Sequence, residues 1–276
     1  MQMPSLQLNS GTSIPQLGLG TWPMDDAQAA VAVAAAAELG YTHFDTATKY
    51  GNEAGVAEGM RRTGLPREEL FVTTKLDGEF QGEDRAIAGL EAALARMRLD
   101  YVDLLLIHWP LPRRGQYVST WRTFQKLLAD GRAHAIGTSN FTAAHLETLA
   151  RETDVVPAVN QIQLTPYVPR ETQRAYADAH GIRTSSWSPL GGEEGQVTRD
   201  PLIREIADAH GRTPAQIVLR WHVQNGLVVI PKSANPARMA ENMAIFDFEL
   251  SEDDLTRIAS ISQGPDAGVN SDVIGH

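Results

Sequence analysis

Four ionisable side chains end or follow three successive apolar runs in the first half of the sequence. Asp45 lies in the first run and Tyr50 in the loop after it, while Lys75 ends the second run and His108 ends the third. A phenol has a reference pKa of about 10, too high for easy proton donation at neutral pH, and a nearby ammonium lowers it. A carboxylate would hold that ammonium, and a neutral imidazole would orient a carbonyl oxygen. Together these groups predict a site that protonates a developing alkoxide.

Each of these residues also has a purely structural interpretation. Asp45 and Lys75 could form a simple ion pair at the rim of the fold, since buried charges are normally paired. His108 could be a hydrogen-bonded core histidine, and Tyr50 a surface aromatic in a Gly-Asn loop. Their placement at successive strand ends favours the catalytic interpretation of the set.

A second candidate site lies late in the sequence, at Ile230-Pro-Lys232-Ser233 and the following Arg238. Two cations and a hydroxyl fit a phosphate monoester, and the alternative is an ordinary solvated helix start. Barrels often bind phosphate in the loops after their last two strands. Gly18-Leu-Gly20 does not complete a dinucleotide fingerprint, and no Walker pattern follows any predicted strand.

These residues must be positioned by a regular alternation of strands and helices. The strand-like runs are apolar throughout, which is typical of parallel strands covered on both faces. Strands are predicted at Tyr41–Ala47, Leu70–Leu76, Tyr101–Trp109, Ala133–Asn140, Val156–Leu164, Arg183–Pro189, Leu227–Ser233 and Ile245–Phe248. Helices are predicted at Ala27–Leu39, Glu53–Thr63, Asp84–Met97, Val118–Ala129, Ala143–Arg151, Glu171–Ala179, Pro201–Ala209, Pro214–Gln224, Ala237–Met243 and Glu252–Ile261.

Eight such units in succession favour an α/β fold of the closed (β/α)8 type, a TIM barrel, over an open doubly wound sheet. Leu6-Gln-Leu and Ile14–Leu19, on either side of Asn9-Ser-Gly11, predict an N-terminal β-hairpin before the barrel, at about residues 5–20. We expect a single domain over residues 1–276, with extra helices and a C-terminal tail from about residue 263. In a barrel, chemistry lies at the carboxyl ends of the strands, where the ionisable residues stand.

Composition excludes several classes of protein. The 276 residues carry 24 Lys and Arg against 34 Asp and Glu, a formal net charge of −10, and no cysteine. A disulfide scaffold, a Cys-ligated zinc site, an iron–sulfur protein and a cysteine nucleophile are therefore excluded. The acidic balance argues against a nucleic-acid partner. The eight histidines show no ligand-like spacing, so no metal is expected. His276 and the others apart from His108 are interpreted as structural or surface residues, with His43 on the strand face that Asp45 shares.

The amino terminus lacks the basic start and apolar core of a signal peptide. Ala27–Ala37 is apolar but too short to span a bilayer, and Glu38 closes it. Asp25 before this run, and Ser251 before the last helix, are predicted helix caps. A cytoplasmic protein with no membrane partner is expected.

Six motifs follow one another along the chain: Gly40–Ala47 with Tyr50–Glu53, Thr74-Lys75, Leu106–Pro110, Gly137–Phe141, Val159–Ile162, and Ile230–Ser233 through Arg238 to Asn242. In their order and spacing, these motifs resemble those of the aldo-keto reductases over essentially the whole chain. Within that family, Trp187-Ser-Pro-Leu190 and the compact length are most similar to the bacterial 2,5-diketo-D-gluconate reductase branch.

The resemblance implies an enzyme that reduces an aldehyde or ketone by hydride transfer from NADPH, forming NADP+. It implies that Tyr50 donates the proton and that Lys75, held by Asp45, modulates the pKa of Tyr50. His108 would orient the substrate carbonyl.

The resemblance also implies roles for twelve cofactor-binding positions. Along the cofactor they are Ser139, Asn140 and Gln161 on the carboxamide, Trp187 stacked on the nicotinamide, Ser188, Leu190 and Gly191 along the pyrophosphate, Lys232, Ser233 and Arg238 on the 2′-phosphate, and Glu241 and Asn242 at adenine.

Trp22 and Trp109 would wall the substrate pocket beside Tyr50 and His108. The expected partner is a small carbonyl compound such as a keto-sugar or methylglyoxal, and a monomer is expected. The sequence departs from the family pattern at Thr42, Ala57 and Thr138, in the segment Asp77–Glu83, in the loop Gly191–Gly195 and in the tail after Gln263.

Two other functions remain open at this point. Lysines at the strand ends of barrels can form Schiff bases, so Lys75 could serve an aldolase. The chain could also be a non-catalytic NADPH-binding sensor or regulatory protein, although a pure sensor need not keep Tyr50 beside Lys75.

Overall fold

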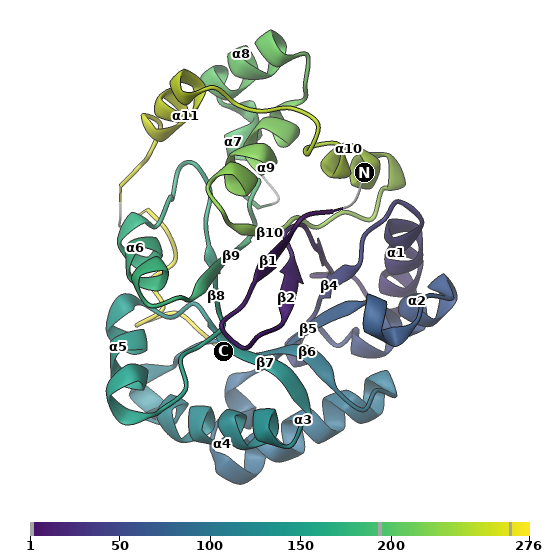
Figure 1. Cartoon of the computed structure of the whole chain (residues 1–276), viewed down its shortest axis with the longest axis vertical. Coiled ribbons are helices and arrows are strands. Elements are labelled where there is room, and N and C mark those ends of the chain that lie inside the picture. The colour runs from purple at the N-terminus through teal and green to yellow at the C-terminus, as the bar shows by residue number, and fades with distance from the viewer. Residues whose placement is uncertain (1–2, 193–194, 265–266) are drawn as a thin grey trace.

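Eight parallel strands form one curved sheet at the centre of the molecule, inside a ring of helices (Figure 1). The protein is described by a computed structural model, which covers residues 3–192, 195–264 and 267–276. Each strand pairs with the next along the chain, so the sheet runs from β3 to β10 without a crossover. The strands are β3 Leu19–Gly20, β4 His43–Asp45, β5 Phe71–Leu76, β6 Val102–Ile107, β7 Ala133–Ser139, β8 Val159–Gln163, β9 Arg183–Trp187 and β10 Val228–Ile230.

The barrel closes where the chain around β3 meets β10. The amides of Gly18 and Gly20 donate to the carbonyls of Val229 and Pro231 at 2.9 and 3.0 Å. A Cβ at Gly18 would lie 2.7 Å from Cδ1 of Ile230, so this close approach requires glycine. The predicted (β/α)8 architecture is confirmed.

The predicted strand at Ile245–Phe248 is wrong, because β3 takes its place in the sheet. The segment forms turns and bends after the helix before it, and Ile245 is fully buried in the main hydrophobic cluster. Arg220 donates from Nη1 to the Ile245 carbonyl at 3.1 Å. Leu19 and Gly20, predicted as part of the hairpin region, belong to the barrel instead.

The N-terminal hairpin consists of β1 Ser5–Gln7 and β2 Ser13–Pro15, which pair antiparallel. It lies across the axis of the barrel in Figure 1, in purple. Leu8 and Ile14 are buried in the same cluster as Phe71 of β5, so the hairpin closes the amino-terminal end of the barrel. The opposite end is left open for a site.

The helices begin and end close to their predicted bounds, and they surround the sheet in Figure 1. Asp25 and Ser251 cap their helices as predicted. No helix in the described ranges is long and apolar enough to cross a membrane. The helices are α1 Asp26–Glu38, α2 Glu53–Thr63, α3 Glu83–Met97, α4 Tyr117–Ala129, α5 Ala143–Glu152, α6 Glu171–Ala179, α7 Gln196–Arg199, α8 Pro201–His210, α9 Pro214–Gln224, α10 Pro236–Met243 and α11 Glu252–Ala259.

Candidate active site

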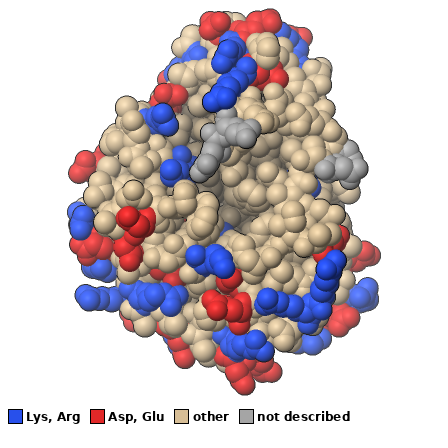
Figure 2. Space-filling model, turned by 180° about the vertical axis from the view of Figure 1, so that it is seen from behind, with Lys and Arg blue, Asp and Glu red and all other residues tan. Residues whose placement is uncertain are grey.

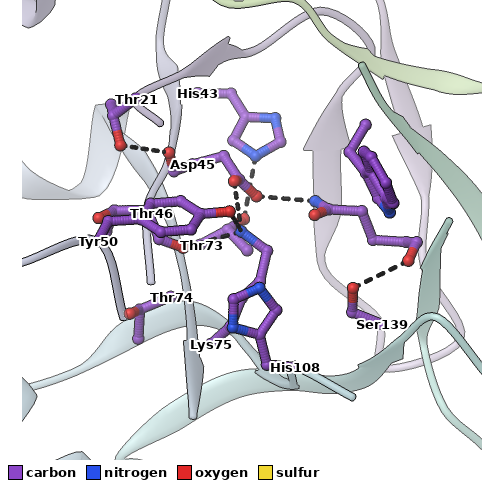
Figure 3. Close-up of polar contacts among 12 residues, drawn as sticks. Thr21, His43, Asp45, Thr46, Tyr50, Thr73, Thr74, Lys75, His108 and Ser139 are labelled. Carbon is purple, nitrogen blue, oxygen red and sulfur yellow. Dashed lines mark hydrogen bonds and ion pairs between the residues drawn. The ribbon is translucent and has the colours of Figure 1, made fainter. Parts of the chain in front are cut away.

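The carboxyl ends of β4, β5 and β6 bring Asp45, Lys75 and His108 together, and the short helix η1, Thr48–Tyr50, adds Tyr50 (Figure 3). The Nζ atom of Lys75 donates to Oδ1 of Asp45 at 2.5 Å and lies 3.5 Å from the hydroxyl of Tyr50. The Tyr50 and His108 rings meet edge to face, with centroids 5.8 Å apart. These four side chains, which are separated in the sequence, therefore form one cluster in the folded chain.

Lys75 is a buried ammonium with a complete set of partners. Burial alone would lower its pKa, but the carboxylate of Asp45, and then Tyr50, outweigh burial and raise it. Nζ also donates to the carbonyl of Thr46 at 2.9 Å. The second oxygen of Asp45 accepts from Nε2 of Gln161 at 2.7 Å, which fixes the carboxylate. Lys75 thus presents a fixed positive charge to the phenol.

The pKa of the Tyr50 phenol is raised, because burial disfavours the phenolate. Lys75 lowers this pKa and Asp45 raises it, and the lowering by Lys75 does not outweigh burial. Lys75 thus acts on the pKa of Tyr50 in the predicted direction, while burial makes the net shift upward. The predicted arrangement of an ammonium beside the phenol is present.

His108 is buried, and its imidazole is neutral. Burial lowers its pKa well below the usual value, and the positive charges of Lys75 and Lys49 act in the same direction. Within the described residues, its Nδ1 atom has no hydrogen-bond partner. A neutral imidazole in this position can form a hydrogen bond to a substrate oxygen.

The ends of β7, β8 and β9 form a hydrogen-bonded rim beside these four residues. Nδ2 of Asn140 donates to Oγ of Ser139 at 3.1 Å, and Oδ1 of Asn140 accepts from Nε1 of Trp187 at 2.8 Å. Oγ of Ser139 donates to the carbonyl of Gln161 at 3.0 Å. The rim holds the Trp187 indole at the edge of the site, and it brings together the four residues predicted to hold a nicotinamide.

A cavity of about 380 Å³ opens over the floor formed by Tyr50 and His108. Trp22 and Trp109 line it together with Trp187. Trp22 is 55% exposed and its ring lies 5.1 Å from that of Tyr50, so it forms the outer rim. Trp109 is buried and forms an inner wall. The structure places both predicted wall residues in the lining.

A second cleft, of about 840 Å³, continues from this cavity, since Trp22, Ser188 and Lys232 line both. The cleft leads past the loop after β9 to α10. Gly191, also predicted here, forms the turn of that loop, with its amide donating to the Ser188 carbonyl at 3.0 Å. The other predicted cofactor residues in the lining of the cleft are Leu190, Ser233, Arg238, Glu241 and Asn242.

Two cations in the lining of this cleft lack acidic partners in the described ranges. Lys232 and Arg238 are exposed, and no described carboxylate oxygen lies within 4.0 Å of either. Ser233 is buried and accepts at Oγ from the amide of Asn235 at 3.1 Å. Figure 2 shows the hollow in this face of the molecule, with basic side chains along its margin. The position suits an anionic ligand.

Two residues that the sequence interpretation left out of the site also lie in it. Asp77 follows β5, and its Oδ1 is in direct contact with Nδ1 of His276. The His276 ring lies edge-on to that of His108, with centroids 4.8 Å apart, and it lines the cavity. His276, interpreted from the sequence as a structural or surface residue, is exposed and also contributes to the lining of the cavity. Asp77 could have been found from its place two residues after Lys75, whereas no spacing signal pointed to His276.

Comparison with known proteins agrees with this geometry. A model of the Aldo/keto reductase family matches residues 15–263. An aldo-keto reductase from Mycolicibacterium smegmatis is 48% identical over 96% of both chains, and methylglyoxal reductase DkgA from Salmonella typhimurium is 45% identical over 98% of both. The crystal structure of a Gox0644 variant in complex with NADPH is 42% identical, with a TM-score of 0.95 over all of both chains. By fold and by sequence, this chain belongs to the aldo/keto reductase family.

Proposed function

We propose that this protein reduces small aldehydes and ketones to alcohols with NADPH, and that Tyr50 is the proton donor. The observation that carries the proposal is the buried pair of Lys75 and Asp45, which sets an ammonium 3.5 Å from the phenol at the floor of a cavity. That cavity continues into a cleft lined by two cations, Lys232 and Arg238, that have no carboxylate partner in the described part of the chain.

The cleft fits the cofactor by its chemistry. Lys232, Arg238 and the Ser233 hydroxyl suit a phosphate monoester, the group that distinguishes NADPH from NADH. Trp187 offers an aromatic face at the junction of cleft and cavity, and Ser139, Asn140 and Gln161 lie beside it. A solved relative that is 42% identical binds NADPH. When bound, NADPH supplies the hydride.

The side chains of this protein supply the proton and its control. As the carbonyl carbon gains the hydride, the C=O π bond breaks and the oxygen takes the proton of the Tyr50 hydroxyl. The product is a neutral alcohol and a Tyr50 phenolate. The Lys75 ammonium stabilises that phenolate, which burial alone would make costly. Neutral His108 holds the carbonyl oxygen by a hydrogen bond, and the walls of the cavity exclude water.

The substrate is a small carbonyl compound. A cavity of about 380 Å³ bounded by Trp22, Trp109 and Trp187 admits a short-chain or single-ring carbonyl, and the polar floor takes its oxygen. A relative that is 45% identical is a methylglyoxal reductase. We therefore propose methylglyoxal and similar 2-oxoaldehydes as the first compounds to test, with keto-sugars next.

The arrangement of Lys75 argues against the Schiff-base alternative. A lysine nucleophile must be a neutral amine, so such enzymes lower its pKa. Here the pKa of Lys75 is raised, and its Nζ donates to Asp45 at 2.5 Å. Trapping of a substrate on Lys75 by borohydride would contradict this conclusion.

The deciding experiment compares the Tyr50→Phe variant with the unchanged protein on a panel of carbonyl compounds, followed by the loss of NADPH absorbance. Tyr50→Phe removes one hydroxyl and should keep NADPH binding while kcat falls by at least about 10²-fold, the usual contribution of a general acid. Tyr176→Phe, on the outer helix α6, is the matched control. An unchanged kcat would refute the role of Tyr50. NADPH binding without turnover of any compound would support the sensor instead.

A further inference from the structure

Three potential metal ligands meet beside the cavity, on segments far apart in the chain. Asp77 precedes the short helix η3, Gly78–Phe80, while His108 follows β6 and His276 is the last residue of the sequence. One donor atom from each side chain lies within 4.8 Å of the other two. Nδ1 of His108 is 3.7 Å from Oδ1 of Asp77, which also contacts Nδ1 of His276.

The segment that ends in His276 is held in place from several sides. The amide of Gly78 donates to the backbone oxygen of His276 at 3.1 Å, and the His276 ring packs against Trp109 with centroids 5.9 Å apart. A Cβ at Gly275 would lie 2.7 Å from Leu111, so the chain approaches the wall closely. His276 therefore occupies a defined position beside His108.

A second observation points to a ligand at this place. Nδ1 of His108 is buried and has no hydrogen-bond partner in the described part of the chain, although its neighbour Asp77 is only 3.7 Å away. A buried polar atom without a partner is costly, and it requires an explanation. The imidazole is neutral, which leaves one ring nitrogen with a free lone pair.

We propose that Asp77, His108 and His276 form a binding site for a divalent transition-metal ion of intermediate softness, with Zn²⁺ as its representative. Two imidazoles and one carboxylate are a donor set that such ions prefer over Mg²⁺ or Ca²⁺. Two ligand atoms of one tetrahedral Zn²⁺ lie roughly 3.3 Å apart, since each is about 2.0–2.2 Å from the ion. The spacing observed here needs only small side-chain movements, chiefly of the part-exposed His276.

Nδ1 of His276 is in direct contact with Oδ1 of Asp77. The tautomer of His276 that carries its proton on Nε2 would present the Nδ1 lone pair to the metal. The ammonium of Lys49, whose positive charge would repel a metal ion, lies 3.9 Å from Oδ2 of Asp77. Its side chain is about half exposed, so the ammonium can turn towards solvent.

Such an ion would inhibit the enzyme, a consequence that rests on the proposed reductase function. Zn²⁺ bound to Nδ1 of His108 would place a second positive charge beside Lys75 and would occupy part of the cavity beside Trp109. Removal of the ion by a chelator would restore the site. The metal is thus a regulator of this pocket, and no metal takes part in the proposed reduction.

The test measures Zn²⁺ binding directly, by competition with a chromophoric chelator in the absence of cofactor and substrate. One equivalent should bind to the unchanged protein. His276→Gln and Asp77→Asn should each weaken that binding by roughly tenfold or more, the scale of losing a metal-site group. His134→Gln is the matched control, because His134 also lies beside a carboxylate, Asp103, but outside the cavity. Mg²⁺ should not compete.

Two results of the binding measurement would contradict the proposed zinc site. Equal Zn²⁺ affinity in the unchanged protein and in His276→Gln, or weakening by His134→Gln alone, would overturn the site. In NADPH-oxidation assays, Zn²⁺ should inhibit the unchanged protein, and EDTA should restore its activity. The His276→Gln variant should lose a smaller fraction of its own zinc-free activity when Zn²⁺ is added. Zn²⁺ binding is measured without turnover, so the binding result would stay valid even if the protein did not reduce any carbonyl compound.

Discussion

At the scale of single residues, the charges of this acidic protein are arranged unevenly. Several arginines have carboxylate partners, as Arg96 has in Glu53 and Arg67 in Asp103. Lys232 and Arg238 line the cleft with no such partner among the described residues. Because both side chains line the same cleft as the Ser233 hydroxyl, we propose that they bind the cofactor phosphate.

Arg238→Ala tests that attribution. The variant should bind NADPH less tightly by about 1–3 kcal/mol, the range of a hydrogen bond to a charged group, and should bind NADH almost unchanged. The measurement is the dissociation constant of each cofactor by quenching of tryptophan fluorescence. Arg122→Ala is the control, since Arg122 lies on α4 beside Glu152. Equal losses for both cofactors would show that Arg238 does not distinguish them.

At the scale of elements, the position of Tyr50 depends on how closely α2 approaches α1. Asn52, just before α2, donates from Nδ2 to the Thr21 and Met24 carbonyls and ties the Tyr50 loop to the chain after β3. Gly55 in the first turn of α2 has no room for a side chain, because a Cβ there would lie 2.2 Å from the carbonyl oxygen of Asp26. The close contact between α1 and α2 therefore helps to set the position of the loop that carries Tyr50.

Gly55→Ala should destabilise the protein even though alanine is the better helix former. The propensity gain is about 1 kcal/mol, whereas the clash is with backbone and forces α1 and α2 apart. We expect a net loss of about 1–3 kcal/mol in the free energy of unfolding, measured by urea denaturation. Gly89→Ala in α3 is the matched control, since the three atoms nearest to its Cβ would all belong to the Phe80 side chain, at 2.8–3.0 Å, rather than to backbone. A variant Gly55→Ala as stable as the control would refute the packing argument.

At the scale of the whole molecule, two buried histidines hold the barrel together as neutral groups. His43 lies inside the barrel, as the sequence predicted, and bonds to Oγ1 of Thr73 at 3.0 Å. His222 on α9 bonds to Oγ of Ser186 on β9 at 3.1 Å. Burial lowers the pKa of each to about 4. Both are therefore neutral in the folded protein over the range in which a free histidine takes up a proton.

This predicts a loss of stability as the pH falls. Below about pH 6.5 the unfolded chain binds a proton at each of these histidines, whereas the folded protein binds it only near pH 4. The unfolded state thus holds more protons, and the free energy of unfolding should fall by about 1.4 kcal/mol per pH unit for each histidine in that window. Urea denaturation at pH 7 and pH 5 measures the slope. His222→Gln should reduce it, and the exposed His180→Gln is the control. An unchanged slope in His222→Gln would contradict the assignment.

Most helices and strands, and most residues of the candidate site, could be predicted from the sequence. Strand and helix bounds follow from local periodicity and capping, as Asp25 and Ser251 show, and these are properties of neighbouring residues. Asp45, Lys75 and His108 were predictable because the topology of a parallel barrel places all strand ends at one rim. The family resemblance added the cofactor residues of the cleft.

Three features required the folded chain: the segment that closes the barrel, the direction of the pKa shift of Tyr50, and the side chains that lie next to His108. A two-residue strand such as Leu19–Gly20 carries no periodic signal, so its pairing with β10 depends on contacts across the whole chain. The pKa depends on burial, which is a sum over distant segments. His276 reaches Asp77 from the other end of the chain, and no local pattern encodes such a contact.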